Sequence, residues 1–503
     1  MQFKKRVIHA IVAPIIASAA SSALAVSGGA LVYSQSALAN DSAELEALRA
    51  QVQELDQKIK VLARKDEIGE EEAVAKKKET PTVRASQDGF GLKSADGKNE
   101  IKFRALAQLD YRNYDKVNGL GSDGKNISGF DFRRIRPTIE GTIFGIYDFR
   151  FTPEFGEAKT ANASSTSGIV DAYIDARFQP WFQVKAGKFK PYVGLERLQS
   201  GGDLKFIERS YVSNNILPNR DLGASIHGDI FDNKVNYALG IFNGAVDGGD
   251  ISTAQDTNKD KDYAFRIFTT PFKDSDNALG DLGVGLAGTY GNFRGSAAAN
   301  LSGLPNYKTA GQESNFFTYS AASFANGDRQ RIAPQAYYYY GPFGAIAEYA
   351  LVSQDVTNGA RTDRLENDAW QIAASYLITG EDASFKGVKP KHEFTTDGDG
   401  WGAWELVARY QENNIDDNAF NLAAAGAGLR YADPRTNAHS AKSWAAGVNW
   451  YLNQNIKLAL DYENTAFDGG GQVDAAGLAT GGFTNISNRP SERTLFSRLQ
   501  LTY

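Results

Sequence analysis

From residue 99 onward, apolar and polar side chains alternate with a period of two. In the stretch EIKFRALAQLDYR, Phe103 and Leu109 lie on one face, and Arg104 and Gln108 lie on the other. This alternation is typical of a β-strand with one apolar and one polar face. Similar runs, each near the roughly ten residues of a tilted membrane strand, recur to the C-terminus. We count about sixteen of them.

The turns between these strands indicate how they connect. Short turns such as Asp232-Asn233 and Gly341-Pro342 join strands at one end, and long polar segments join them at the other. This asymmetry and the apolar, aromatic face are typical of an outer-membrane barrel. A soluble sandwich or propeller also alternates, but it has no need of an apolar face opposite charge on every strand. We therefore expect an all-β fold, a transmembrane antiparallel β-barrel of about sixteen strands over residues 89–503, wide enough for a water-filled channel.

The N-terminal residues follow a different pattern. Basic residues at positions 4–6 precede a long apolar run, and the small residues at 37–39 offer a cleavage site. We therefore expect residues 1–39 to be an export signal. No later apolar run approaches the roughly 20 residues that a spanning helix needs, so strands would have to cross any membrane.

Residues 40–65 carry apolar side chains at alternating spacings of three and four, which is the a/d pattern of a coiled coil. These side chains belong to Leu45, Leu48, Val52, Leu55, Ile59 and Leu62. We expect a short coiled-coil helix that joins copies of the chain, rather than a lone helix packed on the barrel. A dimer and a trimer both fit so short a repeat. Residues 66–88 hold charge blocks and Pro81, which predicts a flexible linker.

Composition excludes several classes of protein. The formal net charge of −6 argues against a nucleic-acid binder held by phosphate contacts. The chain has no Cys, and its four His lie far apart, so neither a thiol nucleophile nor a zinc cluster is expected. No pairing of a nucleophile with a base is visible. We expect no cofactor, no metal and no enzymatic activity.

Arginines gather in FDFRRIRPTIEG, residues 130–141. The phenylalanines and isoleucines of this stretch share the outer face only if the alternation shifts by one at Arg133-Arg134. A β-bulge there is therefore predicted, and Arg134 and Arg136 then face the lumen. Unpaired guanidinium groups offer forked donors that match phosphate oxygens, and rows of Arg and Lys are how pores select anions.

The same wall carries acids that could neutralise these bases. By parity Asp110, Asp148, Asp171 and Asp175 also point inward. A wall of ion pairs without anion preference is therefore an open alternative to an anion site.

The connection after the fifth strand, residues 191–222, is long and carries both signs of charge. We expect it to fold into the lumen as a constriction, as the corresponding loop does in sixteen-stranded porins. Arg197 and Arg209 lie in it, and Gly201-Gly202 allows a sharp turn whose backbone N–H groups face an anion.

Over nearly the whole barrel the chain resembles the phosphate-selective porin O and P family. The resemblance is carried by FDFRRIRPTIEG, GKFKPYVGLERLQS, FIERS, YLITGE, GWGAWELVARY and GVNWYLNQNIKLALDYE. It implies a porin of the Gram-negative outer membrane, assembled as a homotrimer of sixteen-stranded barrels and surrounded by outer-membrane lipids. It also implies an arginine ladder that leads phosphate-type anions passively to a site at the constriction, and we expect these anions to be phosphate or polyphosphate.

The resemblance also implies which residues form that site. The positions that match the family's site are Gln108, Arg133, Arg134, Asp171, Ser200 and Arg209. Other positions depart from it: Leu106 stands where an arginine is expected, Asp148 where a lysine is, Arg136 replaces a tyrosine, Gly201 a serine, and Arg197 the loop lysine. With a further arginine at Arg150, these changes predict a shifted or broader anion site. We therefore add Arg136, Arg150 and Arg197 to the candidates.

Two other functions remain open. One is a weakly selective pore, or a pore for sugars or organic anions, in which Tyr173, Tyr337 and Tyr339 support stacking if they face the lumen. The other is a structural barrel that its coiled coil, lying in the periplasm, tethers to the cell wall.

Overall fold

The computed structural model describes residues 35–86, 89–115, 128–156, 168–251, 259–273, 275, 277–297, 301–421, 430–471 and 486–503. The expected export signal, residues 1–39, lies outside these ranges except for 35–39. The chain divides into two units, Met1–Lys78 and Glu79–Tyr503.

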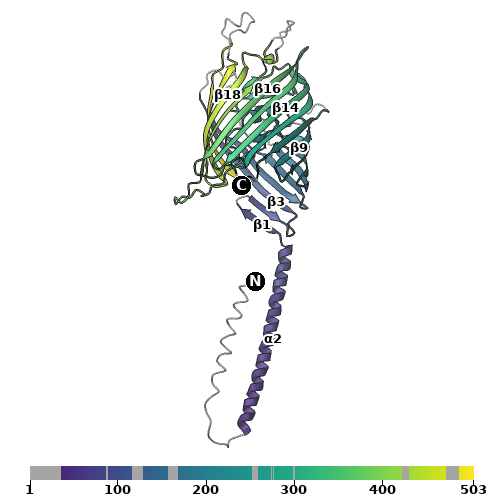
Figure 1. Cartoon of the computed structure of the whole chain (residues 1–503), viewed down its shortest axis with the longest axis vertical. Helices are drawn as coiled ribbons and strands as arrows, with labels where there is room; N and C mark the ends of the chain where they lie inside the picture. Colours follow the sequence, from purple (N-terminus) through teal and green to yellow (C-terminus); the bar gives the residue numbers. More distant parts are fainter. Residues whose placement is uncertain are drawn as a thin grey trace. The chain divides into compact units, whose positions relative to one another are not determined.

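The first unit contains one described helix, α2 (Gln35–Glu79; Figure 1). Its coiled-coil positions are exposed, with Leu48 62%, Leu55 58% and Leu62 60% accessible. Ion pairs between residues four apart, such as Lys60 with Asp56 at 2.7 Å, lie along its surface. Of the residues described, no helix is both long and apolar enough to cross a membrane.

This helix is longer than the predicted range of 40–65. Residues 66–79, which were expected to begin the flexible linker, continue it without a break. The physical reason is composition, because ten of these fourteen residues are Glu, Lys or Ala, which are strong helix formers. Strand β1 (Thr82–Ser86) then follows closely, so most of the expected linker has regular structure.

The second unit is an antiparallel β-barrel (Figure 1). Among the described residues sixteen strands pair in chain order, and β20 pairs with β3 to close the ring. This confirms the predicted barrel and its strand number. The strands are β3 (Glu100–Tyr114), β4 (Gly129–Ile143), β5 (Tyr147–Glu154), β6 (Gly168–Gln179), β7 (Phe182–Phe189), β8 (Asp221–Ile230), β9 (Val235–Phe242), β10 (Asp262–Thr269), β11 (Asp281–Arg294), β14 (Ser323–Tyr340), β15 (Phe343–Asn358), β16 (Arg361–Leu377), β17 (Ala403–Asn414), β18 (Ala438–Tyr451), β19 (Ile456–Gly469) and β20 (Glu492–Thr502).

The two faces of the wall differ as the alternation predicts. Phe130 is 70% and Phe132 51% exposed on the outer face, whereas Gln108 and Arg112 are buried inside. A hairpin of β1 and β2 (Gly89–Lys93) extends the sheet beside the first residues of β3. Its strands are too short to show an alternating pattern, so the sequence did not predict them.

The connections are less asymmetric than predicted. At the short-turn end, Asp232 and Asn233 form a tight turn with positive φ angles of 57° and 61°, which these residue types tolerate. However, β16 and β17 are joined at this same end by a long segment, residues 378–402. At the opposite end β15 and β16 are joined by residues 359–360 alone.

Two long connections fold into the lumen. The first, residues 190–220 between β7 and β8, is the predicted constriction loop and contains α3 (Leu195–Leu198) and η1 (Val212–Ile216). The second joins β11 to β14 and contains β12 (Asn306–Lys308) and β13 (Asn315–Thr318). The two pack together, with ring centroids of Tyr211 and Phe316 6.2 Å apart. The second was not predicted.

Candidate functional site at the constriction

The constriction loop is held against the far wall of the barrel. The carboxylate of Glu348 on β15 accepts hydrogen bonds from the backbone N–H groups of Leu195 (2.6 Å) and Glu196 (3.1 Å). The carboxylate of Asp461 on β19 accepts from the N–H of Ile207 at 2.6 Å. The loop begins at β7 and ends at β8, and β15 and β19 lie across the ring from these two strands. The loop therefore crosses the lumen.

The predicted bulge is present on β4. Gln108 pairs with Arg134, but the next residue of β3 pairs with Phe132, so Arg133 is the extra residue. A bulge re-aims side chains, and here both arginines contact groups inside the barrel. Arg133 donates to the carboxylate of Glu208 on the constriction loop at 2.6 Å, and Arg134 donates to Oε1 of Gln108 at 2.6 Å.

Most charges of the inner wall are paired. Each of the four inward aspartates has a basic partner: Asp110 with Arg498 (2.6 Å), Asp148 with Arg177 (2.8 Å), Asp171 with Arg220 (3.1 Å) and Asp175 with Lys185 (3.0 Å). Three candidate arginines are paired as well: Arg133 with Glu208 (2.6 Å), Arg136 with Glu154 (2.6 Å) and Arg150 with Glu140 (2.5 Å). Ion pairing, which is the alternative to an anion site, therefore neutralises much of the inner wall.

Three buried arginines lack such a partner. Within the described ranges, no carboxylate lies within ion-pair distance of Arg134, Arg197 or Arg209. Their guanidinium groups donate instead to uncharged oxygens. Arg209 donates to the carbonyl of Gln199 at 2.8 Å, and Arg197 to Oδ1 of Asn219 at 2.9 Å. Their positive charges are therefore not neutralised locally.

The surroundings of the loop arginines disfavour their charged forms. Burial and then repulsion from Arg220 lower the pKa of Arg197 to about 10. Burial and then repulsion from Arg197 hold the pKa of Arg209 well below its ordinary value. Lys190, which donates to the same Gln199 carbonyl at 2.7 Å, has a pKa lowered by burial and by Arg209. A negative charge placed here would relieve this repulsion.

Glycine allows the loop to approach Arg134 closely. A Cβ on Gly201 would lie 3.4 Å from Nε of Arg134 and 3.3 Å from Cδ2 of Leu106. The Gly201 carbonyl accepts a hydrogen bond from Nε2 of Gln108 at 2.9 Å. Next to it, Oγ of Ser200 accepts from the N–H of Gly202 at 3.3 Å. Residues predicted separately on the wall and the loop thus meet here.

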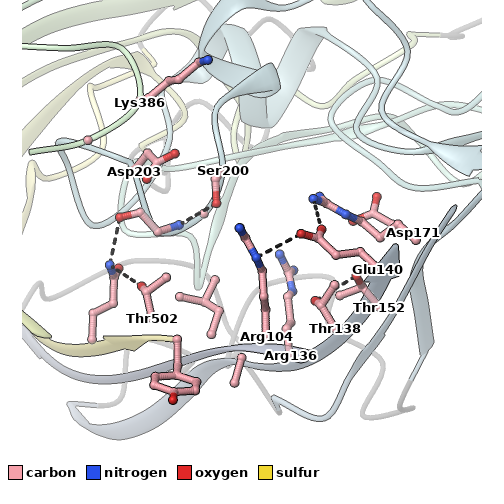
Figure 2. A pocket seen from close by; sticks show the side chains of 18 of the residues that line it. Arg104, Arg136, Thr138, Glu140, Thr152, Asp171, Ser200, Asp203, Lys386 and Thr502 are labelled. Atoms are coloured by element: carbon pink, nitrogen blue, oxygen red, sulfur yellow. Dashed lines mark hydrogen bonds and ion pairs between the residues drawn. The ribbon is translucent and has the colours of Figure 1, made fainter. Parts of the chain in front are cut away.

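A cavity of about 420 Å³ lies between this constriction and the short-turn end (Figure 2). Nine lysines and arginines and three acidic residues line it. Figure 2 shows Arg104 directed at Glu140, with Arg136 beside it; the distance from Nε of Arg104 to Glu140 is 3.0 Å. The candidates Arg136, Arg150, Asp171 and Ser200 line this cavity, and the other candidates lie outside it.

Several cations of the lumen were not among the residues predicted from the sequence. Lys386 and Lys389 line the cavity from the segment 378–402, where a cluster of lysines was the available signal. Lys308 lies on β12, and its N–H donates to Oδ1 of Asn215 on the constriction loop at 3.0 Å. Burial and then repulsion from Arg133 lower its pKa to about 8. Where the chain is described, no group of three His, Asp or Glu could hold a metal ion.

The family model described as phosphate-selective porin O and P matches residues 101–472. Porin O of Pseudomonas aeruginosa is 24% identical over 420 residues, which cover 78% of this chain and 90% of that protein. Among solved structures, the outer membrane channel DcaP of Acinetobacter baumannii is 12% identical with a TM-score of 0.49, covering 83% of this chain and 100% of its own. An anion-selective porin from Comamonas acidovorans is 11% identical with a TM-score of 0.47, covering 80% of this chain and 100% of its own.

Proposed function

Because the chain belongs to the phosphate-selective porin O and P family, we propose that its barrel lets phosphate-type anions diffuse passively through the lumen. The chain is an outer-membrane porin, and proteins of this family and fold are channels rather than enzymes. In our proposal Arg134, Arg197 and Arg209 hold the anion at the constriction. Gln108 and Ser200 supply neutral polar groups beside them.

The observation that supports this site is the set of three buried guanidinium groups without a carboxylate partner. A buried charge is costly unless it is paired. An anion that enters the constriction supplies the missing negative charge and regains part of that cost. Its binding must stay weak enough for release, which several neighbouring cations favour over one tight site.

The paired candidates have a secondary place in this proposal. Arg133, Arg136 and Arg150 each have a carboxylate partner, so an anion would have to compete with that carboxylate. Asp171 acts through Arg220, whose Nε donates to it. We assign these residues to the approaches of the site.

The proposal is tested with purified protein in a planar bilayer under a potassium chloride gradient. We expect a reversal potential that indicates preference for chloride over potassium, and a chloride current that added phosphate blocks. A reversal potential near zero without phosphate block would contradict the proposal. The protein would then be a general porin whose ion pairs cancel the field of the arginines.

We also propose that the barrel assembles as a homotrimer in the lipid bilayer. The exposed apolar residues of α2 support self-association, because an apolar row on a helix in water is stable when copies of it pack together. The chain enters the barrel unit at the short-turn end, which is the periplasmic end of such barrels, so we assign the helix to the periplasm. There it would lie within reach of the cell wall.

A further inference from the structure

We propose that the cavity between the constriction and the periplasmic end binds organic phosphate monoesters as well as inorganic phosphate. The phosphate group would meet the cations of the cavity, and the carbon part would pack on Leu106 and Tyr173. This inference rests on the proposed function, because the same lumen must admit the phosphate group.

The size of the cavity suits a small organic molecule. Its volume of about 420 Å³ falls within the roughly 300–1,000 Å³ of small-molecule sites. An inorganic phosphate ion would leave most of that space to water. The cavity can therefore hold a phosphate group together with a substituent of the size of a ring.

Several of its cations are available to a ligand. Nζ of Lys190 donates to the Gln199 carbonyl at 2.7 Å, and Nζ of Lys457 to the Leu204 carbonyl at 2.8 Å. Within the described chain, neither ammonium has a carboxylate at ion-pair distance. The same holds for Lys386 and Lys389, which are exposed. A phosphate oxygen would thus meet cations that need not leave a carboxylate first.

The cavity also has an apolar wall, which an inorganic anion cannot use. Leu106 shares the inward face of β3 with Gln108 and lies opposite Arg136 in the register. Leu198 of the constriction loop and Val388 of the segment 378–402 line the cavity with it. Removing these apolar surfaces from water requires a ligand with an apolar part. The cations and the apolar side chains of the cavity together match an anion with a carbon substituent.

Tyrosine rings complete this wall beside a guanidinium group. Tyr173 on β6 lies opposite Arg150 in the register, and both line the cavity. The ammonium of Lys185 lies 4.7 Å from the ring centroid of Tyr173 and 5.2 Å from that of Tyr192. Such cation–π contacts fix the two rings in place. Tyr337 and Tyr339, the other two tyrosines considered for stacking, do not line this cavity.

The test compares block of the chloride current by inorganic phosphate, methyl phosphate and phenyl phosphate. We expect phenyl phosphate to block at a concentration about tenfold lower than the other two, because its ring buries apolar surface. Leu106→Ser and Tyr173→Leu should each remove most of this advantage. Block by inorganic phosphate should stay within about twofold in both variants, since no cation is changed.

Tyr339→Leu is the matched control, because Tyr339 is an inward tyrosine that lies outside this cavity. It should leave all three half-blocking concentrations unchanged. Equal block by all three compounds in the unmodified protein would overturn the inference and leave the proposed function standing. Block by phenyl phosphate alone would overturn the proposed phosphate site and support the apolar cavity. Block by none of them would overturn both.

Discussion

Arginines two positions apart on one strand differ in whether their charge is available. Arg136 has the carboxylate of Glu154 at 2.6 Å, whereas Arg134 has the amide oxygen of Gln108 at the same distance. An amide oxygen satisfies a donor but leaves the net charge in place. The partner, rather than the arginine itself, therefore decides which guanidinium can attract an anion.

Replacing Arg134 with Gln should weaken phosphate block strongly. The change removes a buried charge that has no carboxylate partner among the described residues, and a charge-assisted hydrogen bond contributes about 1.5–3 kcal/mol. We expect the half-blocking phosphate concentration to rise at least about tenfold, measured in planar bilayers.

The control for this variant is Arg150→Gln. Glu140 keeps Arg104 as a partner at 3.0 Å after the change, so the local charge balance alters less. We expect its half-blocking concentration to stay within about threefold of the unmodified protein. Equal effects of the two variants would mean that charge pairing does not select the anion-binding residues.

Lys308 should make anion selectivity depend on pH. Its pKa of about 8 means that it is mostly charged at pH 7 and mostly neutral at pH 9. The charged groups around it are Arg133, Glu208, Arg197 and Asp250. Because a positive charge is lost as the pH rises, the reversal potential under a chloride gradient should move toward zero between pH 7 and pH 9.

Two variants separate Lys308 from other groups that titrate in this range. Lys308→Arg keeps its charge at pH 9, so its reversal potential should change less with pH. Lys308→Gln should be less selective already at pH 7. A pH response in Lys308→Arg as large as in the unmodified protein would assign the effect to another residue.

At the residue scale, alternation predicted which side chains of β3 and β4 face the lumen, whereas the resemblance to the family supplied the choice of candidate site residues. Alternation placed Gln108, Arg134 and Arg136 inward and located the bulge beside Arg133. It did not predict ion pairing, because the partners come from other elements. Glu154 lies on the next strand, and Glu208 lies on a loop without a repeating pattern.

At the scale of elements, the constriction depends on how loops attach to the wall. Buried N–H groups of the constriction loop donate hydrogen bonds to side chains of the wall. Glu348 is one acceptor, and Gln411 is another, which accepts from the N–H of Tyr211 at 2.7 Å. The second inward connection attaches to the first. Asn215 both accepts from the N–H of Lys308 and donates to its carbonyl, each at 3.0 Å. Movement of one loop would therefore disturb the other.

Glu348→Ala should widen the pore without unfolding the barrel. It leaves the N–H groups of Leu195 and Glu196 buried without acceptors, which costs about 1–3 kcal/mol for each group. We expect a larger single-channel conductance and weaker phosphate block, while the unheated protein still migrates as a folded barrel in electrophoresis.

Glu348→Gln is the conservative control, because its amide oxygen can still accept one of the two hydrogen bonds. Its conductance should lie between those of Glu348→Ala and the unmodified protein. Unchanged conductance in Glu348→Ala would show that Glu348 does not hold the loop in place.

The elements differ in how well their patterns predicted them. The sixteen strands of the ring were found because each presents a long apolar face. The strands β12 and β13 have three and four residues and lie inside the lumen, so no lipid-facing pattern marks them. The end of α2 was misplaced because its apolar spacing stops at Leu62, although its helix-forming composition continues to Glu79.

At the scale of the whole molecule, a single chain completes the backbone hydrogen bonding of the barrel but does not bury the apolar row of the helix. The ring closes through β20 and β3, so its backbone groups are paired within one chain. Helix α2 leaves its apolar row in water, with Leu55 58% and Ile59 61% exposed. One barrel is therefore a complete pore, whereas no described residue of the chain covers the apolar row of the helix.

Full-length protein with Leu48→Asp, and likewise full-length protein with Leu55→Asp, should form weaker oligomers than the unmodified protein. A charge at a core position of a coiled coil is buried without a partner, so association of the helices becomes unfavourable. We expect the oligomer to dissociate at a lower temperature in detergent, measured by analytical ultracentrifugation after heating. The conductance of each barrel should be unchanged.

Val61→Asp is the matched control, because Val61 is 67% exposed on the same helix but lies outside the apolar row. It adds a similar charge at a position that faces water in a coiled coil, so its oligomers should dissociate at the temperature of the unmodified protein. If all these variants dissociate at that same temperature, contacts between barrels alone hold the assembly together. The apolar row of α2 would then have to pack against something other than a copy of itself, and the cell wall, which is a polar polymer, gives an apolar row no surface on which to pack.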